Sequence, residues 1–200
     1  MKKAFILLLT TFVFASCSMT SFLKENNYAK GQLDFSSGKW LLYKIDASKS
    51  YHYDFESKAL DDFNEIFGSR FTYFPRARNM GFPMQLSLPV SKETLKSLKI
   101  ETQQDYLILM RAKEVANNLG SVGFNNSMRQ FEMEESNQSY FAMVVYDLNT
   151  LEEVYNQKIT GRSSRGTDDN KINFSNNSKK ILNQTYKRLL KDFKNTAYYK

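Results

Sequence analysis

The sequence predicts an α/β (α+β) domain in which about three helices pack on a mixed sheet of about five strands. Apolar runs of strand length occur at 39–45, 105–113 and 140–146. Apolar residues recur at helical spacing at 51–67 and again at 178–194. The resulting order is strand, helix, strand, helix, strand, hairpin, helix, and this order is typical of helices layered on a mixed sheet.

The first predicted strand covers 39–45 and contains Trp40, the only tryptophan, which we expect to anchor the core rather than to hold a ligand. A helix follows from Tyr51, and Gly68 is expected to end it. Its apolar residues recur every three or four positions, as one buried face requires: Phe55, Ala59, Leu60, Phe63, Ile66 and Phe67.

The middle of the chain predicts a strand at 84–88 and a short helix that begins after Ser91 and runs through Lys99. Serine is a preferred residue at the start of a helix because its hydroxyl accepts a backbone hydrogen bond. Glu93 lies in the first turn, where the helix dipole favours negative charge.

The second half predicts the clearest hairpin of the chain. Residues 106–110 are continuously apolar, as in a central strand covered on both faces. A long loop or ragged hairpin is expected at 115–138. The strand 140–146 then turns at 147–150 and returns at 153–160.

The last predicted element is a helix that begins after a loop at 161–173, with Ser178 as its cap. Its apolar stripe is what docking on a sheet requires, and this favours packing over insertion into a membrane surface. The stripe consists of Ile181, Leu182, Tyr186, Leu189, Leu190 and Phe193. The opposite face carries Lys179, Lys180, Lys187, Arg188, Lys191 and Lys194.

The amino-terminal residues have the pattern of an export signal. Lys2 and Lys3 precede an uncharged run at 4–15, which is too short for a membrane-spanning helix. The run ends in Phe14-Ala15-Ser16-Cys17, and Cys17 is the only cysteine. This stretch resembles the lipobox of bacterial lipoproteins, with Phe14 where the family usually has an aliphatic residue. A conventional secretory peptide with a cysteine near the cleavage point is the alternative.

The lipobox resemblance implies that Cys17 carries a diacylglyceryl anchor with acyl chains such as palmitate. It divides the chain into a signal peptide at 1–16, a lipidated tether at 17–38 and a single domain at 39–200. Ser18 follows the cysteine instead of the aspartate that retains lipoproteins in the inner membrane. The resemblance therefore favours the outer membrane, and the lack of an acidic cluster after Cys17 favours its periplasmic face.

The charge of the chain is mildly positive, with a net charge of +7. Removing Lys2 and Lys3 with the signal leaves 26 Lys and Arg against 21 Asp and Glu, a net charge of +5. The excess is spread along the chain and lacks the pattern of nucleic-acid binding, so no nucleic-acid partner is expected.

The inventory of catalytic residues is small. The only histidine is His52, and Cys17 is assigned to lipid, so no catalytic triad is expected. No His and Cys cluster has metal-ligand spacing, and no metal or cofactor is expected. Adjacent acids at 61–62, 134–135 and 152–153 point away from each other, which indicates surface charge rather than a glycosidase pair.

Two loops contain arginines that suit an anion or a partner. Residues 161–166 combine Arg162 and Arg165 with glycines and serines, a composition able to hold an anion. Residues 73–78 place Arg76 and Arg78 beside aromatic residues, as recognition surfaces often do. An ordinary connecting loop is the alternative at both places.

The mature chain also resembles a small α/β domain of envelope lipoproteins, through Asp105-Tyr-Leu-Ile-Leu109, the strand-turn-strand 144–155 and Gly161. That domain occurs at the amino terminus of the Tol-Pal β-propeller protein, in the curli-secretion lipoprotein and in lipoprotein activators of peptidoglycan synthases. The family turn usually reads Asp-x-x-Thr-Gly, and here Leu151 occupies the glycine position.

The resemblance implies a non-enzymatic binding or scaffolding domain with an envelope protein or cell-wall partner. Two other functions remain open at this stage. One is a hydrolase acting on the cell wall or on glycans. The other is an oligomeric subunit of a secretion apparatus.

Overall fold

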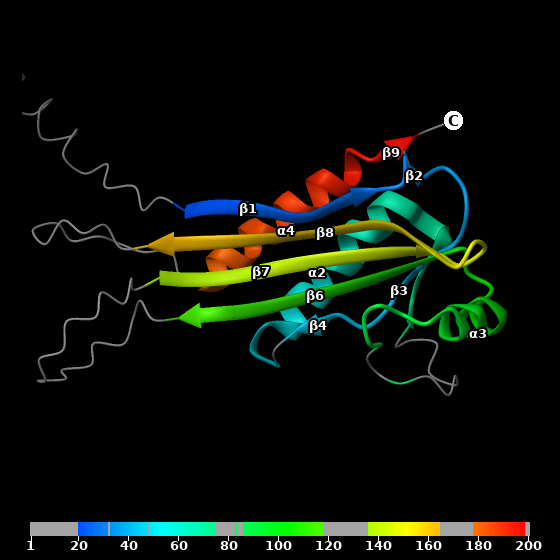
Figure 1. Cartoon of the computed structure of the whole chain (residues 1–200), viewed down its shortest axis with the longest axis horizontal. Helices are drawn as coiled ribbons and strands as arrows, with labels where there is room; N and C mark the ends of the chain where they lie inside the picture. The colour runs from blue at the N-terminus through cyan, green and yellow to red at the C-terminus, as the bar shows by residue number, and fades with distance from the viewer. Residues whose placement is uncertain are drawn as a thin grey trace, which may run out of the picture.

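The computed structural model describes residues 20–31, 33–47, 49–74, 83, 86–117, 136–164 and 178–198. It has the predicted mixed α/β architecture, with one large sheet and three helices in this part of the chain (Figure 1). The helices are α2 (Lys49–Phe67), α3 (Lys92–Thr102) and α4 (Ser178–Lys194), with a 3₁₀ turn at Gly68–Arg70. The strands are β1 (Thr20–Ala29), β2 (Leu33–Asp34), β3 (Trp40–Leu42), β4 (Asp46–Ala47), β5 (Phe71–Tyr73), β6 (Tyr106–Asn117), β7 (Ser136–Asp147), β8 (Glu152–Ser164) and β9 (Ala197–Tyr198).

The main sheet has seven strands in the described residues, in the order β1-β8-β7-β6-β3-β5, with β4 also paired to β6. Strands β1, β8, β7 and β6 are antiparallel neighbours, whereas β3, β4 and β5 run parallel to β6 or to each other. The predicted hairpin is β7–β8, paired from Asp147↔Glu152 to Ser136↔Ser164. The sheet exceeds the predicted five strands because β1 was assigned to the tether and because β4 and β5 are very short.

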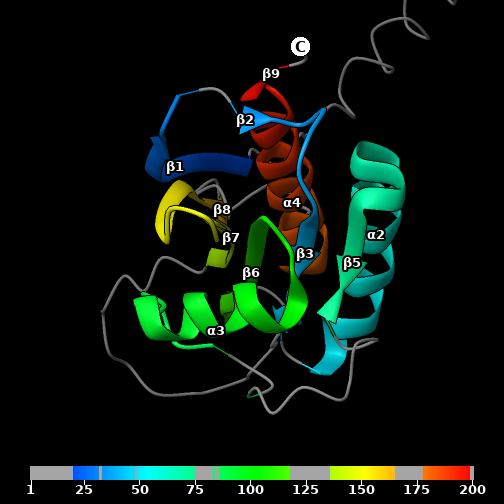
Figure 2. The same ribbon diagram turned by 90° about the vertical axis from the view of Figure 1, so that its right-hand side faces the viewer.

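Helices cover the two faces of the sheet unequally. Helices α2 and α4 lie on one face, and the shorter α3 covers one end of the other face (Figure 2). Alternate side chains of β6 point to opposite faces of the sheet. Ile108 and Met110 pack toward α2 and α4. Leu107 and Leu109 pack toward α3. Among the described residues, no helix covers the half of β6, β7 and β8 that lies beyond α3 on that face.

The larger core lies between the sheet and helices α2 and α4. Trp40 is fully buried there and stacks on Phe67 and Tyr106, with ring centroids 4.2 Å apart in both pairs. The expected role of Trp40 as a core anchor is confirmed. The predicted apolar stripe of the last helix is also confirmed, since Ile181, Leu182, Tyr186, Leu189, Leu190 and Phe193 are all buried.

Three residues were predicted to cap or end helices, and two of them have that role; α2 begins two residues before the predicted Tyr51, and α3 continues past the predicted Lys99 to Thr102. Ser91 Oγ accepts a hydrogen bond from Thr94 N at 3.2 Å and caps α3. Gly68 follows α2 with a φ of 57°, a conformation that glycine adopts without strain. The third prediction was wrong, because Ser178 is itself the first residue of α4 and its Oγ has no hydrogen-bond partner among the described residues.

Three predicted loops or tethers are partly strand. The predicted tether at 17–38 contains β1, whose residues pair antiparallel with β8. The predicted loop at 161–173 begins inside β8, which continues to Ser164, and the predicted loop at 115–138 is strand at both ends. Edge strands and strand ends in contact with water do not need apolar alternation, so their composition resembles that of loops.

The strand predicted at 84–88 is not confirmed. Residues 86–88 belong to no strand, and 84–85 lie outside the described residues. In the described segments, no helix has the length and apolar character to cross a membrane.

Candidate functional site

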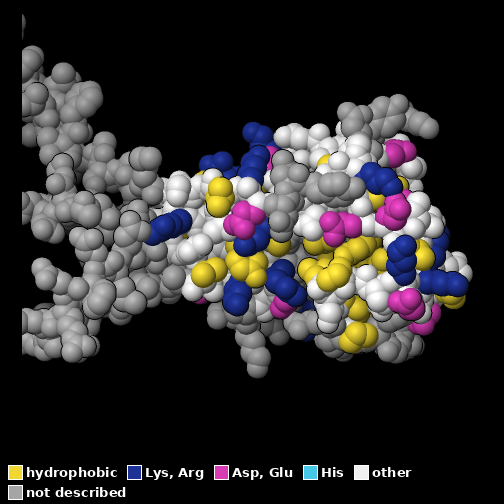
Figure 3. Space-filling model, in the orientation of Figure 1, with side chains coloured by type: hydrophobic (Ala, Val, Ile, Leu, Met, Phe, Trp, Pro, Cys, Tyr) yellow, Lys and Arg dark blue, Asp and Glu magenta, His cyan; other side chains and the backbone are white. Residues whose placement is uncertain are grey.

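A shallow pocket lies on the sheet face that α3 leaves uncovered. Figure 3 shows this face, with hydrophobic side chains gathered over the middle of the sheet. The pocket offers about 30 Å³ of space to water. Its lining comes from the chain after β3, from β6 and β7, and from the segment before α3: Tyr43, Lys44, Asp46, Leu86, Leu88, Leu109, Met110, Arg111, Ala142 and Val144.

An ion pair forms one rim of the pocket. Arg111 Nε donates to Asp46 Oδ2 at 2.7 Å, and both side chains are more than one-third exposed. Arg111 follows the buried run of β6, and β4 pairs with β6 at this point, with Asp46 directly opposite Arg111. The register of two parallel strands therefore fixes the pair at the edge of an apolar floor.

Tyr43 closes the floor of the pocket. Its ring is buried and stacks on Phe74 at 4.2 Å, and its Oη donates to the carbonyl oxygen of Pro83. Burial raises the pKa of Tyr43 to about 12, so the phenol stays neutral at physiological pH. The pocket thus combines an apolar floor with one rim of paired charge, and it can hold an apolar group beside a polar one.

The same face carries a second polar group nearer the start of β1. Lys158 Nζ lies 2.9 Å from Glu25 Oε2, and Thr160 Oγ1 donates to Glu25 Oε1 at 2.7 Å. The hydrogen bonds from Lys158 and Thr160 hold the pKa of Glu25 below its usual range. Lys158 also lies over the ring of Tyr140, 4.9 Å from its centroid. These contacts bind β1 to β8 and leave a polar surface.

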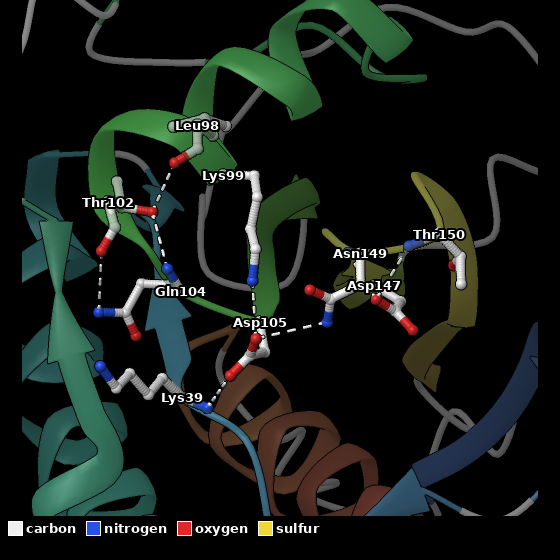
Figure 4. Close-up of polar contacts among 9 residues, drawn as sticks. All are labelled: Lys39, Leu98, Lys99, Thr102, Gln104, Asp105, Asp147, Asn149 and Thr150. Atoms are coloured by element: carbon white, nitrogen blue, oxygen red, sulfur yellow. Dashed lines mark hydrogen bonds and ion pairs between the residues drawn. The ribbon is translucent and has the colours of Figure 1, made fainter.

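A polar cluster centred on Asp105 lies at the opposite end of the sheet (Figure 4). The Asp105 carboxylate accepts hydrogen bonds from Lys99 Nζ at 2.7 Å, from Lys39 N at 2.8 Å and from Asn149 Nδ2 at 3.4 Å. These donors come from α3, from the residue before β3 and from the β7–β8 turn. Asp105 therefore joins three elements, and we assign it a structural role.

The outer surface of α4 is strongly basic. Lys179, Lys180, Lys187, Arg188, Lys191 and Lys194 are all exposed, as the sequence predicts. An open hollow of about 410 Å³ lies along the first part of the helix and is lined by Lys179, Lys180, Asn183, Gln184 and Lys187. The Arg188 guanidinium lies over the ring of Phe22 in β1, 4.0 Å from its centroid.

Most of the site residues predicted from the sequence lie outside the described residues. These are Cys17, Arg76, Arg78 and Arg165. Arg162 is described and is an exposed residue of β8 rather than part of a loop. An anion or partner site at these arginines stays a prediction. Within the described segments, no group of three or more His, Cys, Asp or Glu side chains is placed to hold a metal ion.

The pocket residues Asp46 and Arg111 were not predicted as site residues from the sequence. One signal was present, because Arg111 interrupts an otherwise apolar strand at 106–112. A lone cation in such a strand requires either a partner or a route to water. Asp46 carried no comparable signal, since its pairing with Arg111 depends on the parallel register of β4 and β6.

Comparison with known proteins identifies no family for the chain. No family model matches it, and no curated protein matches it. Among solved structures, the PelC dodecamer from Paraburkholderia phytofirmans matches with 11% identity over 91% of this chain and 100% of that chain, at a TM-score of 0.44. Lipoprotein GNA1162 from Neisseria meningitidis matches with 10% identity over 80% and 99%, at 0.41. The LpoB C-terminal domain from Salmonella enterica matches with 13% identity over 70% and 88%, at 0.33. None of these likenesses supports a statement about the chemistry of this chain.

Proposed function

We propose that this chain is a lipid-anchored protein of the cell envelope whose domain binds another envelope protein and does not catalyse a reaction. The observation that carries the binding role is the pocket on the uncovered sheet face, with its apolar floor and its Arg111–Asp46 rim. An apolar centre bordered by polar and charged groups is the usual anatomy of a protein interface.

The dimensions of the pocket favour a protein partner over a small molecule. Its space of about 30 Å³ would hold about two water molecules, and ligand pockets are roughly ten or more times larger. Such a pocket accepts the end of one apolar side chain. Anchoring by a few inserted side chains is how protein interfaces concentrate their binding energy.

The carboxylates near the pocket already have partners. Asp46 pairs with Arg111, and Glu25 is held by Lys158 and Thr160. A glycosidase requires two carboxyl groups that face one cleft across the scissile bond. These contacts favour binding over hydrolysis as the role of this face.

The lipid anchor is supported by the sequence from Lys2 to Cys17, and the start of β1 adds a spatial argument. β1 begins at Thr20, three residues after Cys17. Three extended residues span at most about 10 Å. A lipidated Cys17 would hold the domain at the membrane surface. We assign it to the outer membrane because Ser18 follows the cysteine, and to the periplasmic face because no acidic cluster follows it.

The anchor is tested by growing cells with an alkyne-bearing fatty acid and detecting the label on the purified full-length protein. The wild-type chain is expected to carry the label, Cys17→Ser to lose it, and the matched control Ser18→Ala to retain it. A wild-type chain without label would contradict the anchor.

The binding role is tested by photocrosslinking in intact cells. A benzophenone amino acid at Leu88, which is 38% exposed at the pocket rim, is expected to give a discrete crosslinked protein. Ala142→Trp fills the pocket and is expected to abolish that product. The same probe at Ile100, 66% exposed on α3, is the control. Identical products from Leu88 and Ile100, or no effect of Ala142→Trp, would contradict the proposed interface.

A further inference from the structure

We propose that the exposed basic face of α4 lies against anionic phospholipid headgroups and gives the domain a second, electrostatic contact with the membrane. This inference rests on the proposed anchor at Cys17, because the anchor brings the domain to the lipid surface. The contact is distinct from insertion, since the apolar stripe of α4 is already buried against the sheet.

Four of the six cations on this face, Lys187, Arg188, Lys191 and Lys194, have no carboxylate partner among the described residues. All six are exposed, and the only acid in α4 is Asp192. Asp192 is occupied by Lys24 Nζ at 2.7 Å and by Gln157 Nε2 at 2.9 Å.

Packing places this face beside the start of β1. Arg188 lies over the ring of Phe22, and a β-carbon on Gly161 would meet both Ile181 of α4 and Phe22. Phe22 is only five residues after Cys17. At about 1.5 Å per residue, the cations from Lys180 to Lys194 lie within roughly 12 Å of Arg188 along the helix axis. The basic face therefore lies beside the start of β1, the described element that follows the proposed anchor in sequence.

The closeness of the basic face to the start of β1 favours the membrane surface as its partner. Attraction between exposed charges extends about 8 Å at physiological ionic strength, so it acts only on surfaces that are close. The proposed anchor keeps the first residues of β1 within about 10 Å of the bilayer. Four to eight Lys and Arg on one helix near a membrane are the pattern that binds anionic headgroups. The hollow lined by Lys179, Lys180 and Lys187 also offers ammonium donors that suit phosphate oxygens.

The test uses the acylated full-length protein in vesicles of phosphatidylcholine alone or of phosphatidylcholine mixed with phosphatidylglycerol. An amine-reactive reagent labels the lysines, and mass spectrometry measures the rate at each position. Lys187, Lys191 and Lys194 are expected to react several-fold more slowly in the anionic vesicles, and high salt is expected to restore their rates. Lys92 and Lys96, exposed on α3, are the internal control and should react equally in both vesicles. Equal rates at the α4 lysines in the two vesicles would overturn the inference.

A charge-reversed variant separates headgroup binding from simple burial. Lys187→Glu with Lys191→Glu is expected to remove the protection of Lys194, whereas Lys92→Glu with Lys96→Glu is expected to leave it unchanged. All four side chains are exposed, and circular dichroism checks that both variants fold. Protection of Lys194 that survives the α4 variant would overturn the inference.

The mass of the Cys17 peptide separates failure of this inference from failure of the anchor. An acylated chain without α4 protection overturns only the α4 contact. A chain without acyl groups contradicts the anchor, and cosedimentation of that same chain with the two vesicle types then tests α4. Equal sedimentation with both vesicle types would overturn the α4 contact as well.

Discussion

Gly161 of β8 and Ile181 of α4 approach so closely that a β-carbon on Gly161 would lie 2.5 Å from Cγ2 of Ile181. The same β-carbon would lie 3.0 Å from Cγ2 of Thr185 and 3.1 Å from Cε1 of Phe22. The helix therefore packs directly on the strand backbone. Glycine is needed here for close approach.

Replacing Gly161 with alanine is expected to destabilise the protein by about 1–3 kcal/mol, because the added methyl group overpacks the contact and forces α4 to move. Urea unfolding measures the change. Arg162→Ala, at the exposed neighbouring position, is the control and should change stability by less than about 0.5 kcal/mol. Equal unfolding midpoints for the two variants would show that the helix does not pack as described.

Replacing Gln103 with glycine is expected to stabilise the protein by about 0.5–1 kcal/mol. Gln103 follows α3 with a φ of 51°, a left-handed conformation that strains a residue with a β-carbon. Thermal unfolding measures the gain. Lys96→Gly, at an exposed position inside the same helix, should instead cost about 1 kcal/mol. A loss of stability in the Gln103 variant would contradict the left-handed geometry.

Replacing Asp105 with asparagine is expected to cost about 1–3 kcal/mol at neutral pH, because Lys99, Lys39 N and Asn149 lose a charged acceptor. Urea unfolding at pH 7 measures this loss. Glu101→Gln, an exposed acid on α3, is the control and should remain within about 0.5 kcal/mol of wild type.

The effect of Asp105 should also depend on pH. Burial raises the pKa of Asp105, but the hydrogen bonds from Lys99, Lys39 N and Asn149 outweigh it and leave the folded-state pKa below 3.8. The stabilisation is therefore complete above the unfolded pKa of about 3.9 and is lost as the pH falls through the lower folded value. Unfolding curves of wild type and Asp105→Asn should converge in that acidic window, and a constant difference would contradict this assignment.

Above pH 10, the Tyr43→Phe variant is expected to lose less free energy of unfolding than the wild type as the pH rises. Burial raises the pKa of Tyr43 to about 12, against about 10 in the unfolded chain. The folded state thus holds this proton more tightly, and its contribution is present below pH 10 and is lost between about 10 and 12. Unfolding free energies measured across this range test the prediction. Parallel curves for wild type and variant would rule out a contribution from Tyr43.

The sequence predicted best the elements that bury one continuous face. Helices α2 and α4 and the hairpin β7–β8 have apolar residues at the period of their secondary structure, because the large core imposes that spacing. Ser91 and Gly68 were predictable for local reasons, since each satisfies a backbone requirement of its own helix end. In the turn after β7, Leu151 has a φ of 58°, a left-handed conformation that glycine adopts more readily than leucine, and the leucine itself gave no sign of it.

The elements that depend on distant partners could not be predicted. The polar residues of β1 have a composition typical of a tether. They form a strand because β8, far along the chain, pairs with them through backbone hydrogen bonds. Gly161 was predicted to begin a loop, because the sequence alone does not show its contact with Ile181. The Arg111–Asp46 rim of the pocket likewise depends on the register of two strands that the sequence does not encode locally.

The pairing of β1 with β8 also sets an order of events during synthesis. Strands β6, β7 and β8 pair with neighbours in sequence, whereas β1 pairs with a strand made near the end of the chain. Local pairs form before distant ones, because closing a long loop is slow. On the ribosome or beyond a translocon, residues 20–29 emerge early and are paired late. Residues 20–29, which follow the proposed anchor in sequence, would thus be unpaired and accessible to an acyltransferase during synthesis.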